Sequence, residues 1–191
     1  MDTSNIHATG RSRALLATLL LLAVTTALAG AMVWSRAHHV LGERFHALGW
    51  EMSLRVPLHF RQDVVSANAA SFDGWTRSGH PARLIVWRIP LPEPASASEV
   101  VAGVMAKYDR AERNGARRAM RSQSSQPMGE KTGQQLLDRQ LGVIARAITV
   151  PSIPAFALTL GVEGHGIDDS TYDLFDRVCR SIVFESANPG S

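Results

Sequence analysis

Cysteine is nearly absent from this sequence of 191 residues, which contains only Cys179. A single cysteine cannot form an intramolecular disulfide, so the fold must be stabilised by packing alone. A large charge of either sign is absent too, because 20 basic and 17 acidic residues leave a formal net charge of +3. This small excess gives no reason to expect a nucleic-acid partner.

Motifs of the common catalytic sites are missing as well. The sequence contains no Gly-x-Ser-x-Gly elbow, no Walker phosphate-binding loop and no His-Glu-x-x-His metal motif. It also contains no visible internal repeat. We therefore predict no catalytic residue and no cofactor, and the sequence favours a protein without enzymatic activity.

Charge is absent from one long stretch, which runs for 21 residues from Ala14 to Trp34 and follows Arg11 and Arg13. At a rise of about 1.5 Å per residue, a helix of this length reaches about 31 Å, enough to cross a hydrocarbon core of about 30 Å. The two arginines favour a cytoplasmic N-terminus. The stretch therefore predicts a single-pass membrane protein, anchored through residues 14–34, whose following domain is extracytoplasmic.

The same stretch also fits a cleavable signal peptide. In that interpretation Arg11 and Arg13 precede an apolar core, and Ala27, Leu28 and Ala29 form an Ala-x-Ala cleavage site. Cleavage after Ala29 would give a secreted domain. Both interpretations export the rest of the chain, so we expect another envelope protein as the partner.

The chain divides around this stretch into five segments. They are a cytoplasmic tail (1–13), the transmembrane helix or uncleaved signal anchor (14–34), a stalk (35–48), an extracytoplasmic domain (49–186) and a C-terminal tail (187–191). Apolar residues at helical spacing predict that the stalk is a helix. On that helix His39, Glu43 and His46 would share one face, where they could bind zinc, although a solvated face is the favoured interpretation.

The domain is predicted to contain several strands and two helices. Strands are expected at residues 52–56, 64–65, 82–89, 117–124, 133–139, 143–150 and 155–162. Turns are expected at residues 73–74, 79–81 and 127–129. One helix begins at a capping box formed by Ser96 and Glu99 and ends near residues 114–115, and the second begins at residues 168–170. The short connections between the later strands favour an antiparallel meander.

A particular order of elements is visible within this pattern. The opening strand Met52-Ser53-Leu54-Arg55-Val56-Pro57 ends in a proline, a helix precedes the meander, and in the closing helix Phe175 is followed by Ser181 and Ile182. This arrangement resembles the PsbP-like superfamily, which includes photosystem II extrinsic subunits and bacterial exported proteins of the DcrB type. The resemblance implies an α+β fold, with an antiparallel β-sheet flanked by helices as an α/β/α sandwich, behind the N-terminal transmembrane helix. It also implies a binding or accessory module, and it transfers no catalytic residue.

The best local group of ligand-type side chains lies in residues 163–169. Glu163, His165 and Asp168 occur there at a predicted junction between a strand and a helix, and such groups could hold a metal ion or supply a general base. The plainer interpretation is a glycine-containing loop that ends in an N-cap. If the first interpretation holds, His59 or His80 would complete the site.

Two further features have mainly structural interpretations. Six basic residues between Lys107 and Arg121 could contact anionic lipid or an acidic partner, but a solvated helix face is favoured. Cys179 falls within the apolar stripe of the closing helix, which predicts a buried hydrophobic side chain rather than a nucleophile.

Three functions therefore stay open. The favoured one is a membrane-anchored extracytoplasmic accessory or binding module without catalytic activity. The first alternative is a small exported hydrolase or metal-binding protein that uses the loop from Glu163 to Asp169. The second is a structural subunit of an envelope complex, in contact with its neighbours through the transmembrane helix.

Overall fold

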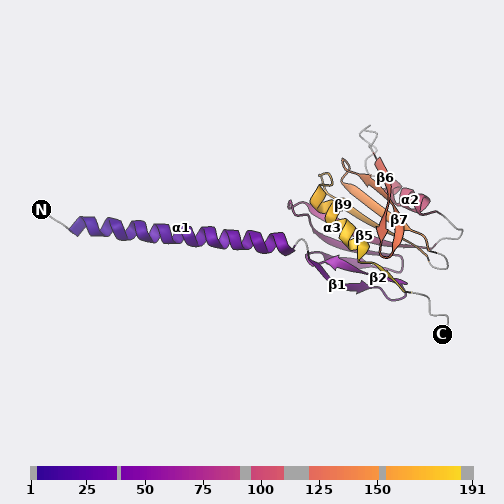
Figure 1. Ribbon diagram of the computed structural model, residues 1–191, viewed down its shortest axis with the longest axis horizontal. Helices are drawn as coiled ribbons and strands as arrows, with labels where there is room; N and C mark the ends of the chain where they lie inside the picture. The colour runs from indigo at the N-terminus through magenta and orange to yellow at the C-terminus, as the bar shows by residue number, and fades with distance from the viewer. Residues whose placement is uncertain (1–3, 38–39, 91–95, 110–120, 151–153, 186–191) are drawn as a thin grey trace. The chain divides into compact units, whose positions relative to one another are not determined.

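The structure, a computed structural model, describes residues 4–37, 40–90, 96–109, 121–150 and 154–185. The chain forms two compact units, residues 1–37 and residues 38–191. The first unit contains one helix, α1 (Ser4–Ala37), drawn in indigo to purple in Figure 1. Its segment Leu15–Val33 is long and apolar enough to cross a membrane, and an N-terminal signal sequence has the same properties.

Two threonines lie within this apolar segment, and the helix backbone accepts a hydrogen bond from each hydroxyl. Thr25 Oγ1 donates to the carbonyl oxygen of Leu21 at 3.0 Å, and Thr26 Oγ1 donates to that of Leu22 at 2.8 Å. A polar group in hydrocarbon must find its partner within the protein, because no water is available there. The two threonines are therefore compatible with a helix surrounded by lipid.

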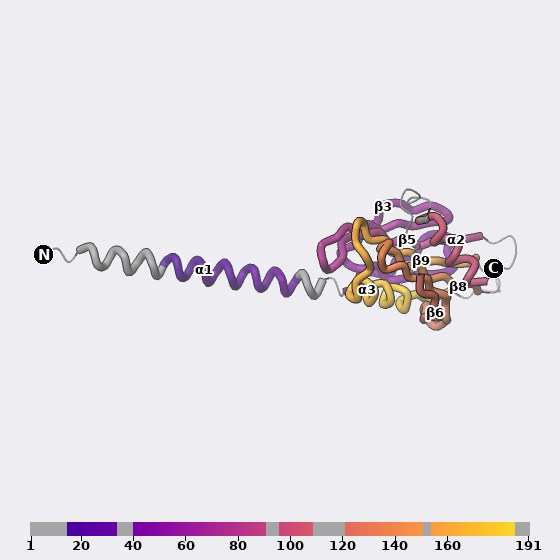
Figure 2. The backbone as a smooth tube through the Cα atoms, turned by 90° about the horizontal axis from the view of Figure 1, so that it is seen from above, coloured from indigo at the N-terminus to yellow at the C-terminus, as the bar shows by residue number. Residues whose placement is uncertain are grey.

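The second unit is α+β and is built on an antiparallel sheet with the strand order β3-β4-β5-β9-β8-β7-β6. Its strands are β3 (Arg61–Val65), β4 (Ala69–Trp75), β5 (Pro81–Ile89), β6 (Arg121–Met128), β7 (Lys131–Asp138), β8 (Val143–Ile148) and β9 (Ala155–Val162). The outermost strands, β3 and β6, lie at opposite edges of the sheet (Figure 2). The predicted meander is confirmed for β6 to β9, because β6 pairs with β7, β7 with β8 and β8 with β9.

The middle of the sheet joins two parts of the chain that are distant in sequence. Strand β5 pairs with β9 over the whole length of β9, from Ala82 opposite Val162 to Ile89 opposite Ala155. Between β5 and β6 the chain forms α2 (Ala97–Asp109), which packs against β7, β8 and β9 (Figure 1). Because strand side chains alternate, one face of the sheet is left for α2 and the other for the main core.

The main core lies between the large sheet, a small sheet and α3 (Asp169–Arg180). The small sheet has the order β1-β2-β10 and consists of β1 (Leu41–His46), β2 (Met52–Pro57) and β10 (Val183–Phe184). A second, smaller core lies beneath α2 on the opposite face. The large sheet is therefore covered on one face by α2 and on the other by α3 and the small sheet.

The prediction of a helical stalk over residues 35–48 is wrong for residues 41–46, which form β1. Gly42 is a poor helix residue, and Leu41 and Phe45 pack against the main core while the strand pairs with β2. His46 Nδ1 lies 3.0 Å from Glu185 rather than beside Glu43 on a helix face. His39, the third residue of the predicted zinc group, lies outside the described residues.

Several other predictions can be compared with the structure. The strands at residues 52–56, 82–89 and 155–162 are confirmed, and so is the capping box, in which Glu99 accepts from the Ser96 N–H at 2.7 Å. The predicted turn at residues 73–74 is wrong, because these residues continue β4 and pair with β5. The turn predicted at residues 127–129 begins only at Gly129, where φ is +63°. Residues 114–115 and 117–120 lie outside the described part of the chain.

Candidate functional site

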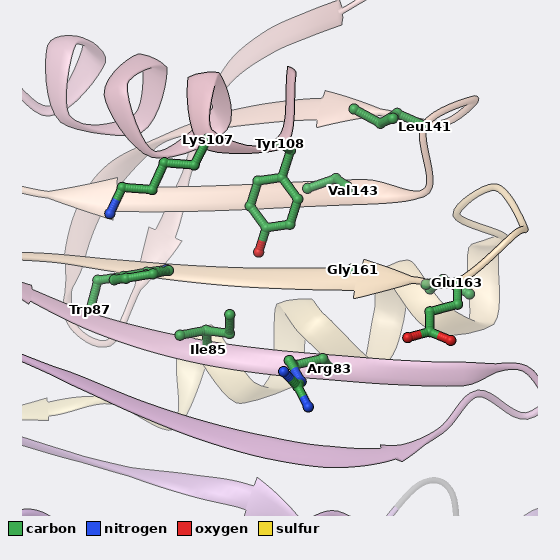
Figure 3. A pocket seen from close by; sticks show the side chains of 10 residues that line it. Arg83, Ile85, Trp87, Lys107, Tyr108, Leu141, Val143, Gly161 and Glu163 are labelled. Carbon is green, nitrogen blue, oxygen red and sulfur yellow. The ribbon is translucent and has the colours of Figure 1, made fainter. Parts of the chain in front are cut away.

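A groove of about 660 Å³ opens on the α2 face of the large sheet. It lies between the C-terminal end of α2 and the strands β5, β8 and β9 (Figure 3). Its lining consists of Arg83, Ile85, Trp87, Lys107, Tyr108, Leu141, Val143, Gly161, Val162 and Glu163. Concave surfaces with an apolar lining and a few polar groups are typical of binding sites.

Small side chains make room for this groove. On the α2 face, β9 carries Ala157, Thr159 and Gly161, which are paired with Trp87, Ile85 and Arg83 of β5. At Gly161 a Cβ atom would lie 3.7 Å from the Tyr108 ring, which is ordinary contact distance. The floor is therefore low because β9 has small residues there, while larger side chains of β5 and α2 form the walls.

The two aromatic walls are fixed by one buried hydroxyl. Thr159 Oγ1 accepts a hydrogen bond from Trp87 Nε1 at 3.2 Å and another from the Tyr108 hydroxyl at 2.9 Å. Thr159 itself has no exposed surface. Burial raises the pKa of the Tyr108 hydroxyl and outweighs the opposite effect of the Thr159 hydrogen bond. The phenol therefore stays protonated near neutral pH and continues to donate to Thr159.

Charged side chains stand at the rim of the groove. The Lys107 ammonium lies 4.0 Å from the centre of the Trp87 ring, a cation–π arrangement, and no described carboxylate forms an ion pair with it. Arg83, in contrast, makes two hydrogen bonds to Asp73, at 2.6 and 2.8 Å. These bonds lower the pKa of the Asp73 carboxyl. Lys107 is thus available to an acidic group of a ligand.

The predicted ligand residues of the 163–169 loop lie in three different settings. Glu163 is exposed at the rim of the groove, where Figure 3 shows its carboxylate to the right of the Arg83 side chain. The His165 ring stacks on that of His80, with 3.3 Å between ring centroids and 21° between ring planes. Asp168 is the N-cap of α3. Among the described residues, no group of three or more histidine, cysteine, aspartate or glutamate side chains is placed to hold a metal ion.

The role of Asp168 is to hold two loops at the start of α3. Its Oδ1 accepts from the Thr171 N–H at 2.7 Å and from Ser170 Oγ at 2.9 Å, and its Oδ2 accepts from Ser78 Oγ at 3.2 Å. The plainer interpretation of the loop, a glycine-containing connection that ends in an N-cap, therefore describes Asp168 correctly. The hydrolase or metal-protein alternative stays a prediction.

Substitution Asp168→Ala should lower the free energy of unfolding by about 1 kcal/mol at neutral pH, because α3 loses its N-cap. Burial opposes ionisation of Asp168, but its hydrogen bonds outweigh burial, so its pKa is lower in the folded than in the unfolded state. The carboxylate therefore contributes stability above its unfolded pKa of about 3.9, and this contribution is lost as the pH falls through the folded pKa. Chemical denaturation between pH 2 and 7 measures both effects.

Asp168→Asn is the control for this prediction, since asparagine caps a helix about as well as aspartate but does not titrate in this range. It should keep most of the stability at pH 7 and lose less on acidification. Equal losses for the alanine and asparagine variants at pH 7 would contradict the capping role.

The two remaining predictions from the sequence concern Cys179 and the basic region between Lys107 and Arg121. Cys179 is fully buried, and burial raises the pKa of its thiol to about 12, so its interpretation as a hydrophobic core residue is confirmed. Of the basic region, Lys107 lies at the groove, and Arg121 Nε lies 3.7 Å from Asp138 Oδ2. The four arginines between them lie outside the described residues, so lipid or partner binding by that region stays a prediction.

The groove itself is absent from the sequence predictions. One signal was available, because Thr159 is a polar residue in the otherwise apolar strand Ala155–Val162. A buried hydroxyl requires hydrogen-bond partners. The sequence does not indicate, however, that these partners are a tryptophan of β5 and a tyrosine of α2.

Comparison with known proteins finds similarity at the level of the fold. No protein-family model and no curated protein sequence matches the chain. The solved structure of the Ran-binding protein Mog1p from Saccharomyces cerevisiae has a TM-score of 0.51 and 11% identity, covering 76% of this chain and 96% of Mog1p. A mutant of protein Mog1 gives a TM-score of 0.51 and 12% identity, with the same coverage of the two chains. The described α+β domain is therefore similar in fold to Mog1.

Proposed function

We propose that this protein is a membrane-anchored accessory module that binds a partner protein through the groove beside α2. In this proposal α1 spans the membrane once with its N-terminus in the cytoplasm, and residues 38–191 form an extracytoplasmic domain of the PsbP-like α/β/α type. The uncharged span within α1 and the arginines before it support the anchor. The cleaved form and the structural-subunit role are the competing possibilities.

The observation that carries the binding role is the fixed position of Trp87 and Tyr108. Both donate to the buried hydroxyl of Thr159, so the walls of the groove keep their positions without a ligand. A preorganised site loses less conformational entropy on binding than a mobile one. Tryptophan and tyrosine are also the residue types that contribute most at protein interfaces.

The charges of the rim indicate the chemistry of the bound segment. Lys107 is available for an ion pair beside an aromatic surface, whereas Arg83 is already paired with Asp73. Apolar side chains such as Ile85 and Val143 also line the groove. We therefore infer that the partner presents an apolar side chain next to an aspartate or glutamate. The Mog1p neighbour is described as Ran-binding, which supports the use of this fold for protein binding.

Photo-crosslinking from the groove would test the proposal. A benzoylphenylalanine placed at Ile85 in the full chain should give one discrete crosslinked protein in native membranes, whereas the same group at Val183, which is 48% exposed on β10, should not. Lys107→Glu should weaken this crosslink about tenfold, which corresponds to roughly 1.4 kcal/mol of binding free energy. Quantitative mass spectrometry of the adducts measures the change.

The matched control is Lys131→Glu, which makes the same charge reversal on an exposed residue of β7 outside the groove lining. It should leave the crosslink from Ile85 unchanged. Identical adducts from Ile85 and Val183, or equal effects of the two lysine variants, would contradict binding through the groove.

A further inference from the structure

Three exposed apolar side chains belong to neighbouring segments at one end of the two sheets. Val40, just before β1, is 47% exposed; Leu58, just after β2, is 63% exposed; and Trp75, the last residue of β4, is 50% exposed. The Leu58 N–H donates to the carbonyl oxygen of Val40 at 3.0 Å. His59 Nε2 lies 2.9 Å from the carbonyl oxygen of Trp75. We call Val40, Leu58 and Trp75 the apolar edge.

The apolar edge does not belong to the core of the domain. Val56 and Phe60, two residues before and two residues after Leu58, are both 8% exposed and pack in the main core. Leu58 lies between them and turns outward. A contiguous exposed apolar patch on a domain is typical of a surface that contacts a partner or a membrane.

The position of the apolar edge in the chain indicates what covers it. Val40 comes seven residues after Val33, which is the last residue of the apolar span of α1. Seven residues of fully extended chain reach at most about 25 Å. If α1 crosses a membrane, the chain therefore keeps Val40 within about 25 Å of the end of the apolar span, and its neighbour Leu58 is within reach of the bilayer surface.

The chemistry of the edge agrees with this position. Tryptophan is enriched at the boundary between hydrocarbon and headgroups, because its ring is apolar and its N–H is polar. Arg61, three residues after Leu58, is exposed and forms no ion pair with any described carboxylate. A cation close in sequence to the apolar edge, with no ion pair to the described carboxylates, fits a surface of anionic phospholipid headgroups.

We propose that the apolar edge, Val40, Leu58 and Trp75, inserts into the headgroup region of the bilayer that α1 spans. This second contact fixes the orientation of the domain on the membrane. The inference depends on the membrane anchoring in the proposed function but not on the groove.

Site-specific labelling of the full chain tests this contact. Because Cys179 is buried, an environment-sensitive fluorophore can be attached to a cysteine introduced by Leu58→Cys, and the unsubstituted chain serves as the labelling blank. The protein is placed in nanodiscs of phosphatidylcholine with a minority of phosphatidylglycerol, with nitroxide-labelled lipids as quenchers. A headgroup nitroxide should quench the label at position 58 about threefold more than a label in bulk water.

Two further labels make the result decisive. Leu48→Cys is the matched control, because Leu48 is a fully exposed leucine that comes just after β1, whereas Val40 of the apolar edge comes just before it. Leu22→Cys, within the apolar span of α1, reports whether the anchor lies in the bilayer. Strong quenching at position 58 with weak quenching at position 48 supports the contact.

Other results distinguish a failure of the lipid contact from a failure of the membrane anchor. Quenching at position 22 by acyl-chain nitroxides, with equal weak quenching at positions 58 and 48, overturns the lipid contact and leaves the anchor standing. The same holds if the label at position 58 is shielded from water without lipid quenching, as contact with a protein or a second copy would cause. Absence of quenching at position 22 overturns the anchor and the lipid contact together.

Discussion

Substitution Arg146→Met should lower the free energy of unfolding by about 3–5 kcal/mol, the range found when one partner of a buried ion pair is removed. Arg146 lies in β8 with no exposed surface. Its Nε and Nη2 donate to Gln135 Oε1 at 3.1 and 2.6 Å, and its Nη1 donates to the carbonyl oxygen of Pro127. Its Nη2 also lies 2.9 Å from Asp176 Oδ1. Methionine fills similar space but leaves these acceptors without their donor.

The loss should be large because these contacts join separate elements. Pro127 belongs to β6, Gln135 to β7 and Asp176 to α3, so one guanidinium links three elements to β8. It also lies 5.6 Å from the centre of the Phe175 ring. Removing it weakens the attachment of α3 to the sheet.

The chain provides a matched control in Arg180→Met. Arg180 Nε pairs with the other oxygen of the same Asp176 carboxylate, but its side chain is 56% exposed. A solvated ion pair within a helix contributes at most about 1 kcal/mol. Urea unfolding of the full chain in detergent, followed by far-ultraviolet circular dichroism, compares the two variants. Similar losses for both would show that burial of Arg146 does not decide the effect.

The network also shows where sequence reasoning about this domain ends. The sequence predicts a strand at residues 143–150, and the structure has β8 at Val143–Ile148. An arginine within a strand would ordinarily be assigned to a solvated face. The partners that bury it come from three other elements, and no spacing in the sequence connects them.

Elements with strong local signals were predictable. The Ser96–Glu99 capping box begins α2, and Asp168 begins α3, because cap hydrogen bonds involve residues only three positions apart. Strand β1 was predicted as a helix, because its apolar residues have helical spacing and its pairing with β2 is a tertiary contact. Tertiary pairing overrides such local preferences.

The candidate site shows the same difference between local signals and tertiary contacts. Glu163, His165 and Asp168 are close in sequence, but Gly164 has a φ of +67° and Asp168 is used by the helix cap, so the loop does not gather its three polar side chains. The groove, in contrast, combines residues 83–87, 107–108, 141–143 and 161–163. Its formation depends on strand order and on the crossover through α2, neither of which is encoded by a local motif.

Substitution Gly142→Ala should lower the free energy of unfolding by about 3 kcal/mol or more, through backbone strain and a steric clash together. Gly142 has a φ of +71°, and its carbonyl oxygen accepts from the Val162 N–H at 2.8 Å. A Cβ atom at this position would overlap the carbonyl oxygen of His165 and lie 2.8 Å from that of Val162. Because both obstacles are backbone atoms, a rotamer change cannot remove the clash. The turn between β7 and β8 must instead move away from the 163–169 loop.

Gly164→Ala separates strain from the clash. Gly164 lies in the loop against which Gly142 packs and has a similar φ of +67°, but a Cβ there would have no atom within 4 Å. It should therefore cost only the strain of the left-handed conformation, about 1–2 kcal/mol. Equal losses for the two variants in urea unfolding would attribute the whole effect of Gly142→Ala to strain.

Since Leu141 and Glu163 line the groove on the two sides of this contact, Gly142→Ala should also weaken the crosslink from Ile85, whereas Gly164→Ala should preserve it. A weaker crosslink in the Gly142 variant alone would connect the packing of these two loops to the shape of the binding groove.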